Sequence, residues 1–102
     1  MKLYIVKYCA NECDDLGYTP PYPIYYSLND DDALGHFYEF VNMAKKSLNE
    51  YLCEHPELKG NEDYSIETDT KNEFEYNFGK WYYKYEFCEA EMEVDLRYKN
   101  FN

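Results

Sequence analysis

Four carboxylates occupy every second position near the end of the chain, at Glu89, Glu91, Glu93 and Asp95. On a β-strand they would project from one face at a spacing of about 6.7 Å, twice the rise per residue. A nucleic-acid backbone also presents one negative charge per regular repeat along each strand. Such a row could occupy a groove lined with Lys and Arg by imitating phosphates. The alternative is the solvated face of an ordinary amphipathic strand, where charges discourage edge pairing.

Further acidic residues extend this candidate partner-binding surface. Neighbouring strands could add a second row of carboxylates, and a run of three aspartates marks a helix start. An exposed tyrosine among them would suit contact with a basic partner. These additional candidates are Glu86, Glu73, Glu75, Asp30, Asp31, Asp32 and Tyr82, with Glu67 and Asp69 beside them.

Catalytic and metal-binding motifs are missing from the sequence. The Asp14-Asp15 and Asp30–Asp32 runs lack the spacing of a calcium loop, and the four glycines are isolated, so no phosphate loop is expected. There is no Gly-x-Ser-x-Gly elbow for nucleophilic catalysis. We therefore expect no enzymatic activity, no metal and no cofactor.

The four cysteines, at positions 9, 13, 53 and 88, do not have the spacing of a redox pair or a zinc site. They are expected to be reduced thiols in a cytoplasmic protein. No apolar run approaches the length of a signal peptide or a membrane span.

Charge and aromatic content indicate a class of partner. The 102 residues carry a formal net charge of −11 and include 14 tyrosines. This charge repels nucleic acid and anionic membranes and attracts basic protein surfaces. Tyrosine supplies rigid contact area at protein interfaces. We expect no direct nucleic-acid binding, although the run from Gly79 to Tyr85 mixes rings with lysines in a way that faintly suggests base stacking.

The elements expected to position these residues follow from periodicity. Residues 2–9 and 24–28 read as strands separated by a proline-rich loop, and residues 64–70 as a weak strand. Asn29 or Asp30 should begin a helix, which His55-Pro56 ends. Its apolar stripe comprises Leu34, Phe37, Val41, Ala44, Leu48 and Tyr51 or Leu52.

A hairpin should follow, with Gly79-Lys80 at its turn. Apolar residues alternate on odd positions up to Phe87 and on even positions from Cys88, which predicts a β-bulge or bend at that point. The resulting fold class is α+β: one domain over residues 1–102, in β-β-α-β-β order, with one long amphipathic helix packed across an antiparallel sheet.

In size, acidity and its heavy use of Tyr, Asn, Glu and Lys, the whole chain resembles small phage and mobile-element proteins that inhibit host defence nucleases. These include DNA-mimicking anti-restriction and anti-CRISPR proteins. The resemblance rests on composition and shares no motif. It implies a non-enzymatic inhibitor whose partner is a basic protein surface such as a CRISPR or restriction nuclease. The alternative is an accessory or assembly subunit that binds through aromatic residues around Tyr22–Tyr26 and Trp81–Tyr85.

Overall fold

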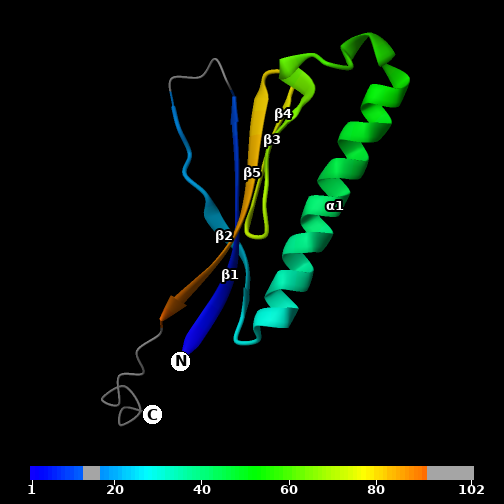
Figure 1. The fold of residues 1–102 in the computed structure, drawn as a ribbon. Coiled ribbons are helices and arrows are strands. Elements are labelled where there is room, and N and C mark those ends of the chain that lie inside the picture. Colours follow the sequence, from blue (N-terminus) through cyan, green and yellow to red (C-terminus); the bar gives the residue numbers. More distant parts are fainter. Residues whose placement is uncertain (13–16, 92–102) are drawn as a thin grey trace.

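The structure, a computed structural model, describes residues 1–12 and 17–91. Five strands and one long helix account for most of them, and two short 3-10 turns follow the helix (Figure 1). The elements are β1 (Lys2–Glu12), β2 (Tyr22–Ser27), α1 (Asp30–Glu54), β3 (Ile66–Asp69), β4 (Glu73–Phe78) and β5 (Trp81–Glu91).

The strands form one antiparallel sheet in the order β2-β1-β5-β4-β3. The two eleven-residue strands, β1 and β5, pair along their whole length in the middle of the sheet. The shorter strands β2 and β3 form its edges. The predicted α+β class is confirmed, and the weak strand expected at residues 64–70 is the edge strand β3.

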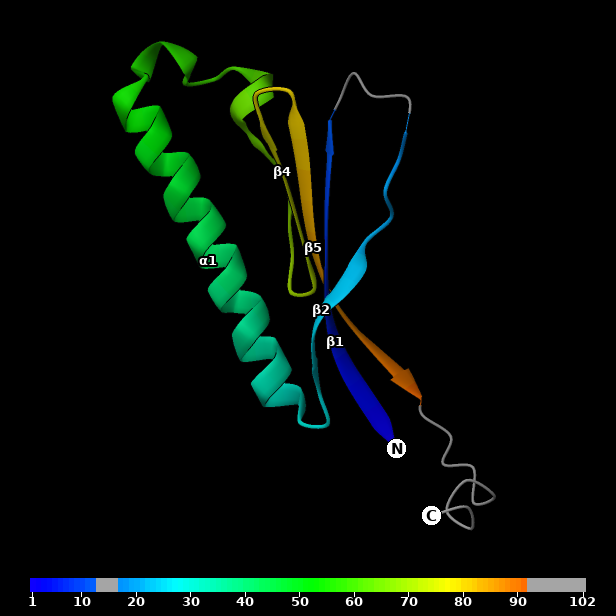
Figure 2. The ribbon, with the colours of Figure 1, turned by 180° about the vertical axis from the view of Figure 1, so that it is seen from behind.

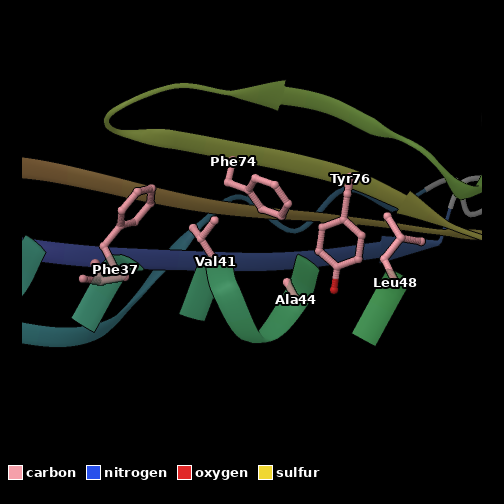
Figure 3. Close-up of a cluster of buried hydrophobic side chains, with 7 residues drawn as sticks. Phe37, Val41, Ala44, Leu48, Phe74 and Tyr76 are labelled. Carbon is pink, nitrogen blue, oxygen red and sulfur yellow. The ribbon is translucent and has the colours of Figure 1, made fainter. Parts of the chain in front are cut away.

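Helix α1 begins and ends where the sequence predicts. The Asn29 side chain caps it by accepting a hydrogen bond from the Asp32 amide, and His55 follows its last residue, Glu54. The buried residues of the helix recur at three- and four-residue steps: Ala33, Phe37, Val41, Ala44 and Leu48. The last four were predicted, whereas Ala33 is buried in place of the predicted Leu34, which is half-buried. Figure 3 shows Phe37, Val41, Ala44 and Leu48 facing Phe74 and Tyr76 of β4.

Aromatic rings supply much of the core because aliphatic residues are few. Phe37, Phe74 and Val6 are fully buried between α1 and the sheet. Tyr83, Tyr85 and Phe87 of β5 pack against this cluster from the same side of the sheet. Helix α1 therefore covers the face that carries the odd-numbered residues of β5 (Figures 1 and 2). We call the opposite side of the sheet the open face, because no described element covers it.

The bulge predicted near Phe87-Cys88 is wrong. Strand β5 pairs with β1 without a register shift from Trp81 to Glu91. Along β5 the apolar residues move from odd to even positions at Cys88, because a different face of the sheet is apolar there. Up to Phe87 the odd residues lie under α1, whereas Cys88 and Ala90 lie on the open face opposite Ile5 and Leu3 of β1.

The predicted turn at Gly79-Lys80 joins β4 to β5. Phe78 pairs with Trp81 across it, and Gly79 has a φ of 66°, as the first central residue of a type II′ hairpin requires. Among the described residues, no helix has the length and apolar character needed to cross a membrane.

Candidate functional site

The carboxylate row at the end of β5 is only partly described, since Glu93 and Asp95 lie outside the described residues. Glu89 and Glu91 are exposed on the same side of the sheet as α1. Each has a positive neighbour at or just before the start of β1: the Glu89 carboxylate lies 3.8 Å from Lys2 Nζ, and that of Glu91 lies 3.0 Å from the terminal ammonium of Met1. These exposed pairs lower the negative charge of the row.

The second predicted row lies on the other side of the sheet. Glu73 and Glu86 are directly opposite each other on β4 and β5, and Glu75 is opposite Lys84, all on the open face. Glu67 reaches the same face, where its carboxylate accepts a hydrogen bond from the Asn77 amide nitrogen at 2.6 Å. Asp69 instead pairs with Lys45 of α1 at 2.7 Å. The described carboxylates therefore do not form one continuous array.

Lys84 ties two of the open-face carboxylates together. Its Nζ lies 3.0 Å from Glu86 Oε1 and 3.4 Å from Glu75 Oε1, and only 18% of its side chain is exposed. Burial alone would lower the pKa of this ammonium, but its bonds to Glu86 and Glu75 outweigh that effect and raise it. Glu75 and Glu86 thus belong to an ion-pair network within the sheet as well as to its surface.

Glu75 is the best-satisfied carboxylate of this network. It accepts hydrogen bonds of 2.5 Å from both the Thr68 and the Tyr82 hydroxyls. These two bonds, with that from Lys84, hold the pKa of Glu75 below its usual value. The sequence predicts an exposed Tyr82, available to a partner. Instead it is half-buried, and burial together with its bond to Glu75 raises the pKa of its hydroxyl.

The three aspartates of the helix start lie in the first turn of α1, away from the Lys84 network. Asp30 and Asp31 are exposed, and the negative charge of all three suits the amide end of the helix. Asp32 also accepts a 2.5 Å hydrogen bond from the Tyr25 hydroxyl, which is the main reason why its pKa is lowered. The His36 ring stacks on Tyr25 with centroids 3.9 Å apart. Asp32 therefore joins β2 to α1.

Sequence reasoning missed an apolar patch on the open face. Large apolar side chains concentrate on and around β2: Tyr26 is 56% exposed, Leu28 62% and Ile24 37%. Tyr26 lies directly opposite Ile5 of β1, which in turn lies opposite Cys88 of β5. We define the open-face patch as Leu3, Tyr26, Leu28, Cys88 and Ala90, which lie around the buried Ile5. The change of parity at Cys88 was the signal that could have revealed it.

The described residues show no constellation for metal binding. No group of three or more His, Cys, Asp or Glu within them could hold a metal ion. Cys9 is fully buried, and desolvation raises the pKa of its thiol, so it would be a poor nucleophile. Cys53 and Cys88 are also present as thiols, and Cys13 lies outside the described residues.

Comparison with protein-family models, with curated proteins and with solved structures gives no match for this chain. The protein is therefore classified by its fold alone. It is a small α+β domain in which a helix covers one face of a five-stranded antiparallel sheet. The other face presents an apolar patch beside acidic residues.

Proposed function

We propose that this chain is a non-enzymatic binding module that docks a basic protein surface onto its open face. The observation that carries the proposal is the open-face patch, with Tyr26 and Leu28 more than half exposed on a sheet face that no described element covers. Exposed apolar surface of this kind is typical of protein interaction sites.

The carboxylates give this contact its charge preference. Glu67, Glu73, Glu75 and Glu86 share the open face with the patch, where Lys7 and Lys84 offset only part of their charge. The field of the whole chain, at −11, would attract a basic partner over a longer range. We infer a mixed interface in which apolar side chains supply affinity and the carboxylates supply orientation and association rate.

A narrower form of the proposal names the partner as a nucleic-acid-binding protein, such as a CRISPR or restriction nuclease, whose basic groove the chain would block. The overall acidity supports this form. The division of the described carboxylates between two faces weakens the version in which a single row imitates phosphates. An accessory or assembly subunit that binds through the aromatic residues around Tyr22–Tyr26 and Trp81–Tyr85 is the second candidate. The exposure of Tyr22, Tyr26 and Trp81 favours it.

The test is a pull-down of the tagged chain from bacterial lysate at low and high salt, followed by mass spectrometry. Two pairs of substitutions separate the contributions on the open face: Tyr26→Ser with Leu28→Ser, and Glu73→Gln with Glu86→Gln. The control is Met43→Ser with Glu50→Gln, which changes exposed residues of α1. Affinity for the recovered partner is then measured for each variant.

For a basic partner, we expect the apolar pair to weaken binding by about tenfold or more, since a central aromatic anchor contributes over about 1 kcal/mol. The Gln pair should reduce the association rate and its salt dependence. Release by competing DNA or RNA would support the nuclease form. If neither the Ser pair nor the Gln pair changes the affinity, the proposal is contradicted. Salt-independent binding that needs only the tyrosines would favour the accessory subunit.

A further inference from the structure

The central strand β5 is longer than its neighbour β4. Strand β4 begins at Glu73, opposite Glu86, and one further backbone hydrogen bond joins the Phe87 amide to the Asn72 carbonyl at 2.8 Å. Strand β5 continues to Glu91 and pairs with β1 throughout. Figure 1 shows the tip of the β3–β4 hairpin stopping well before the end of β5. Within residues 1–12 and 17–91, positions 88–91 thus have a neighbouring strand on one side only.

The backbone groups that point to the vacant side can be identified. The N–H and C=O groups of successive residues in a strand point alternately to the two neighbouring strands. Because the Phe87 amide bonds to Asn72, those of Glu89 and Glu91 point to the same side, where no described backbone group pairs with them. They are therefore available to an added strand.

A groove lies beside this edge. It has a volume of about 600 Å³. It is lined by Leu34 and Tyr38 of α1, by residues 87–89 of β5, and by Lys71 and Asn72 at the hairpin tip. Tyr38 is 44% exposed there. A residue added opposite Glu89 would share the α1 side of the sheet and could place an apolar side chain against Leu34, Tyr38 and Phe87.

Charge indicates what kind of strand would fit. Asp31 precedes Leu34 by three residues and Tyr38 by seven, so it lies on the same side of α1 as the groove wall. Glu89 and Glu91 add carboxylates along the edge, and Lys2, the Met1 ammonium and Lys71 at the hairpin tip offset part of this charge. A second copy of this chain is disfavoured, because antiparallel pairing of two β5 edges would bring these glutamates near their own copies and would join two chains of −11.

We propose that the vacant edge of β5, from Glu89 to Glu91, binds an extended basic segment of another protein by β-strand addition. An apolar side chain of this segment fills the groove at Tyr38, and its Lys or Arg neighbours face Glu91 and Asp31. Main-chain hydrogen bonds supply affinity and the groove supplies selectivity, as in other cases of strand addition. This site lies apart from the open-face patch and does not depend on the function proposed above.

The probe is the synthetic peptide Lys-Thr-Lys-Thr-Phe, amidated at its C-terminus so that it ends before the position that Asn72 occupies, titrated into the full chain. Binding is followed by fluorescence anisotropy and by amide hydrogen exchange at Glu89 and Glu91. In the added strand the Phe would lie opposite Glu89, so N-methylation of its amide removes the donor to the Glu89 carbonyl. N-methylation of the preceding Thr is the matched control, since that amide points away from β5.

We expect the peptide to slow exchange of the Glu89 and Glu91 amides, and N-methylation at Phe to weaken binding by about tenfold, with little effect at Thr. Tyr38→Ala should weaken binding, whereas Met43→Ala, also on α1, and Tyr26→Ser on the open face should not. Equal binding of both methylated peptides, protection confined to the open face, or no binding at millimolar peptide would overturn the proposal. So would slow exchange of the Glu89 amide without peptide, because the edge would then already be occupied.

Discussion

At the scale of single residues, Glu75 is a candidate site residue whose carboxylate is already engaged by its neighbours within the sheet. The sequence placed Glu75, Glu86 and Tyr82 together in a partner-binding surface. The structure does bring them together, but around Lys84, which engages both carboxylates. The Tyr82 hydroxyl is directed at Glu75. A partner that approaches this part of the open face therefore meets a charge network that is already internally satisfied.

The lowered pKa of Glu75 predicts a pH dependence of stability. A carboxyl group with a folded pKa below its ordinary value of 4.5 stabilises the fold above that value and loses this contribution as the pH falls through the folded pKa. In Glu75→Gln the free energy of unfolding should therefore fall less steeply as the pH is lowered below about 5. Urea unfolding from pH 7 to pH 3 checks this.

Glu73→Gln is the control for Glu75→Gln, since it lies two residues away on the same face and its carboxylate has no hydrogen-bond or ion-pair partner among the described residues. It should leave most of this fall at low pH in place. An equally reduced fall in both variants would show that the Thr68 and Tyr82 bonds do not carry the effect.

At the scale of elements, local chemistry sets the limits of the helix and of the β4–β5 hairpin. Asn29 caps α1, and Gly79 allows the two-residue turn that keeps Phe78 opposite Trp81. The two glycines Gly35 and Gly79 have contrasting roles. Gly35 lies inside α1 with no atom within 4 Å of the place that a Cβ methyl would occupy, whereas Gly79 has a positive φ and Tyr64 Oη only 3.3 Å from the corresponding place.

Substitution of these glycines by alanine should have opposite effects. Gly35→Ala should stabilise the fold by about 0.5–1 kcal/mol, because glycine is a poor helix residue. Gly79→Ala should destabilise it by about 1 kcal/mol or more, because alanine disfavours a positive φ. Thermal unfolding should show midpoint shifts of about 4–8 °C per kcal/mol, upward for the first and downward for the second. A neutral Gly79→Ala would mean that the turn changes type.

At the scale of the whole molecule, charge and exposed apolar surface oppose each other. The net charge of −11 keeps copies of the chain apart at neutral pH, while the open-face patch favours association. Near the isoelectric point of about 4.4 the charge repulsion between copies disappears, and the attraction between apolar patches remains.

We therefore expect self-association to increase as the pH is lowered towards about 4.4, and to decrease in the variant that combines Tyr26→Ser with Leu28→Ser. Static light scattering at fixed ionic strength measures this. The control is Met43→Ser, which removes an exposed apolar side chain from α1 and should leave the association unchanged. If the patch variant associates as strongly as the parent chain, the open face is not the adhesive surface.

The sequence by itself determined the charge, the α+β class, the limits of α1 and the turn at Gly79, because each depends on residues close together in the chain. Capping, the three-and-four spacing of the apolar stripe and the two-residue turn are local signals.

Only the tertiary structure decided what each strand face contacts. Alternation shows that Glu89 and Glu91 lie on one side and Cys88 and Ala90 on the other, but not which side α1 covers. Register across strands placed Lys84 opposite Glu75, and Tyr26 opposite Ile5. Strand β4 begins only at Glu73, opposite Glu86, so that among the described residues the end of β5 has no neighbour on that side. Pairing between distant segments depends on how the whole sheet assembles around the helix, and no local pattern encodes it.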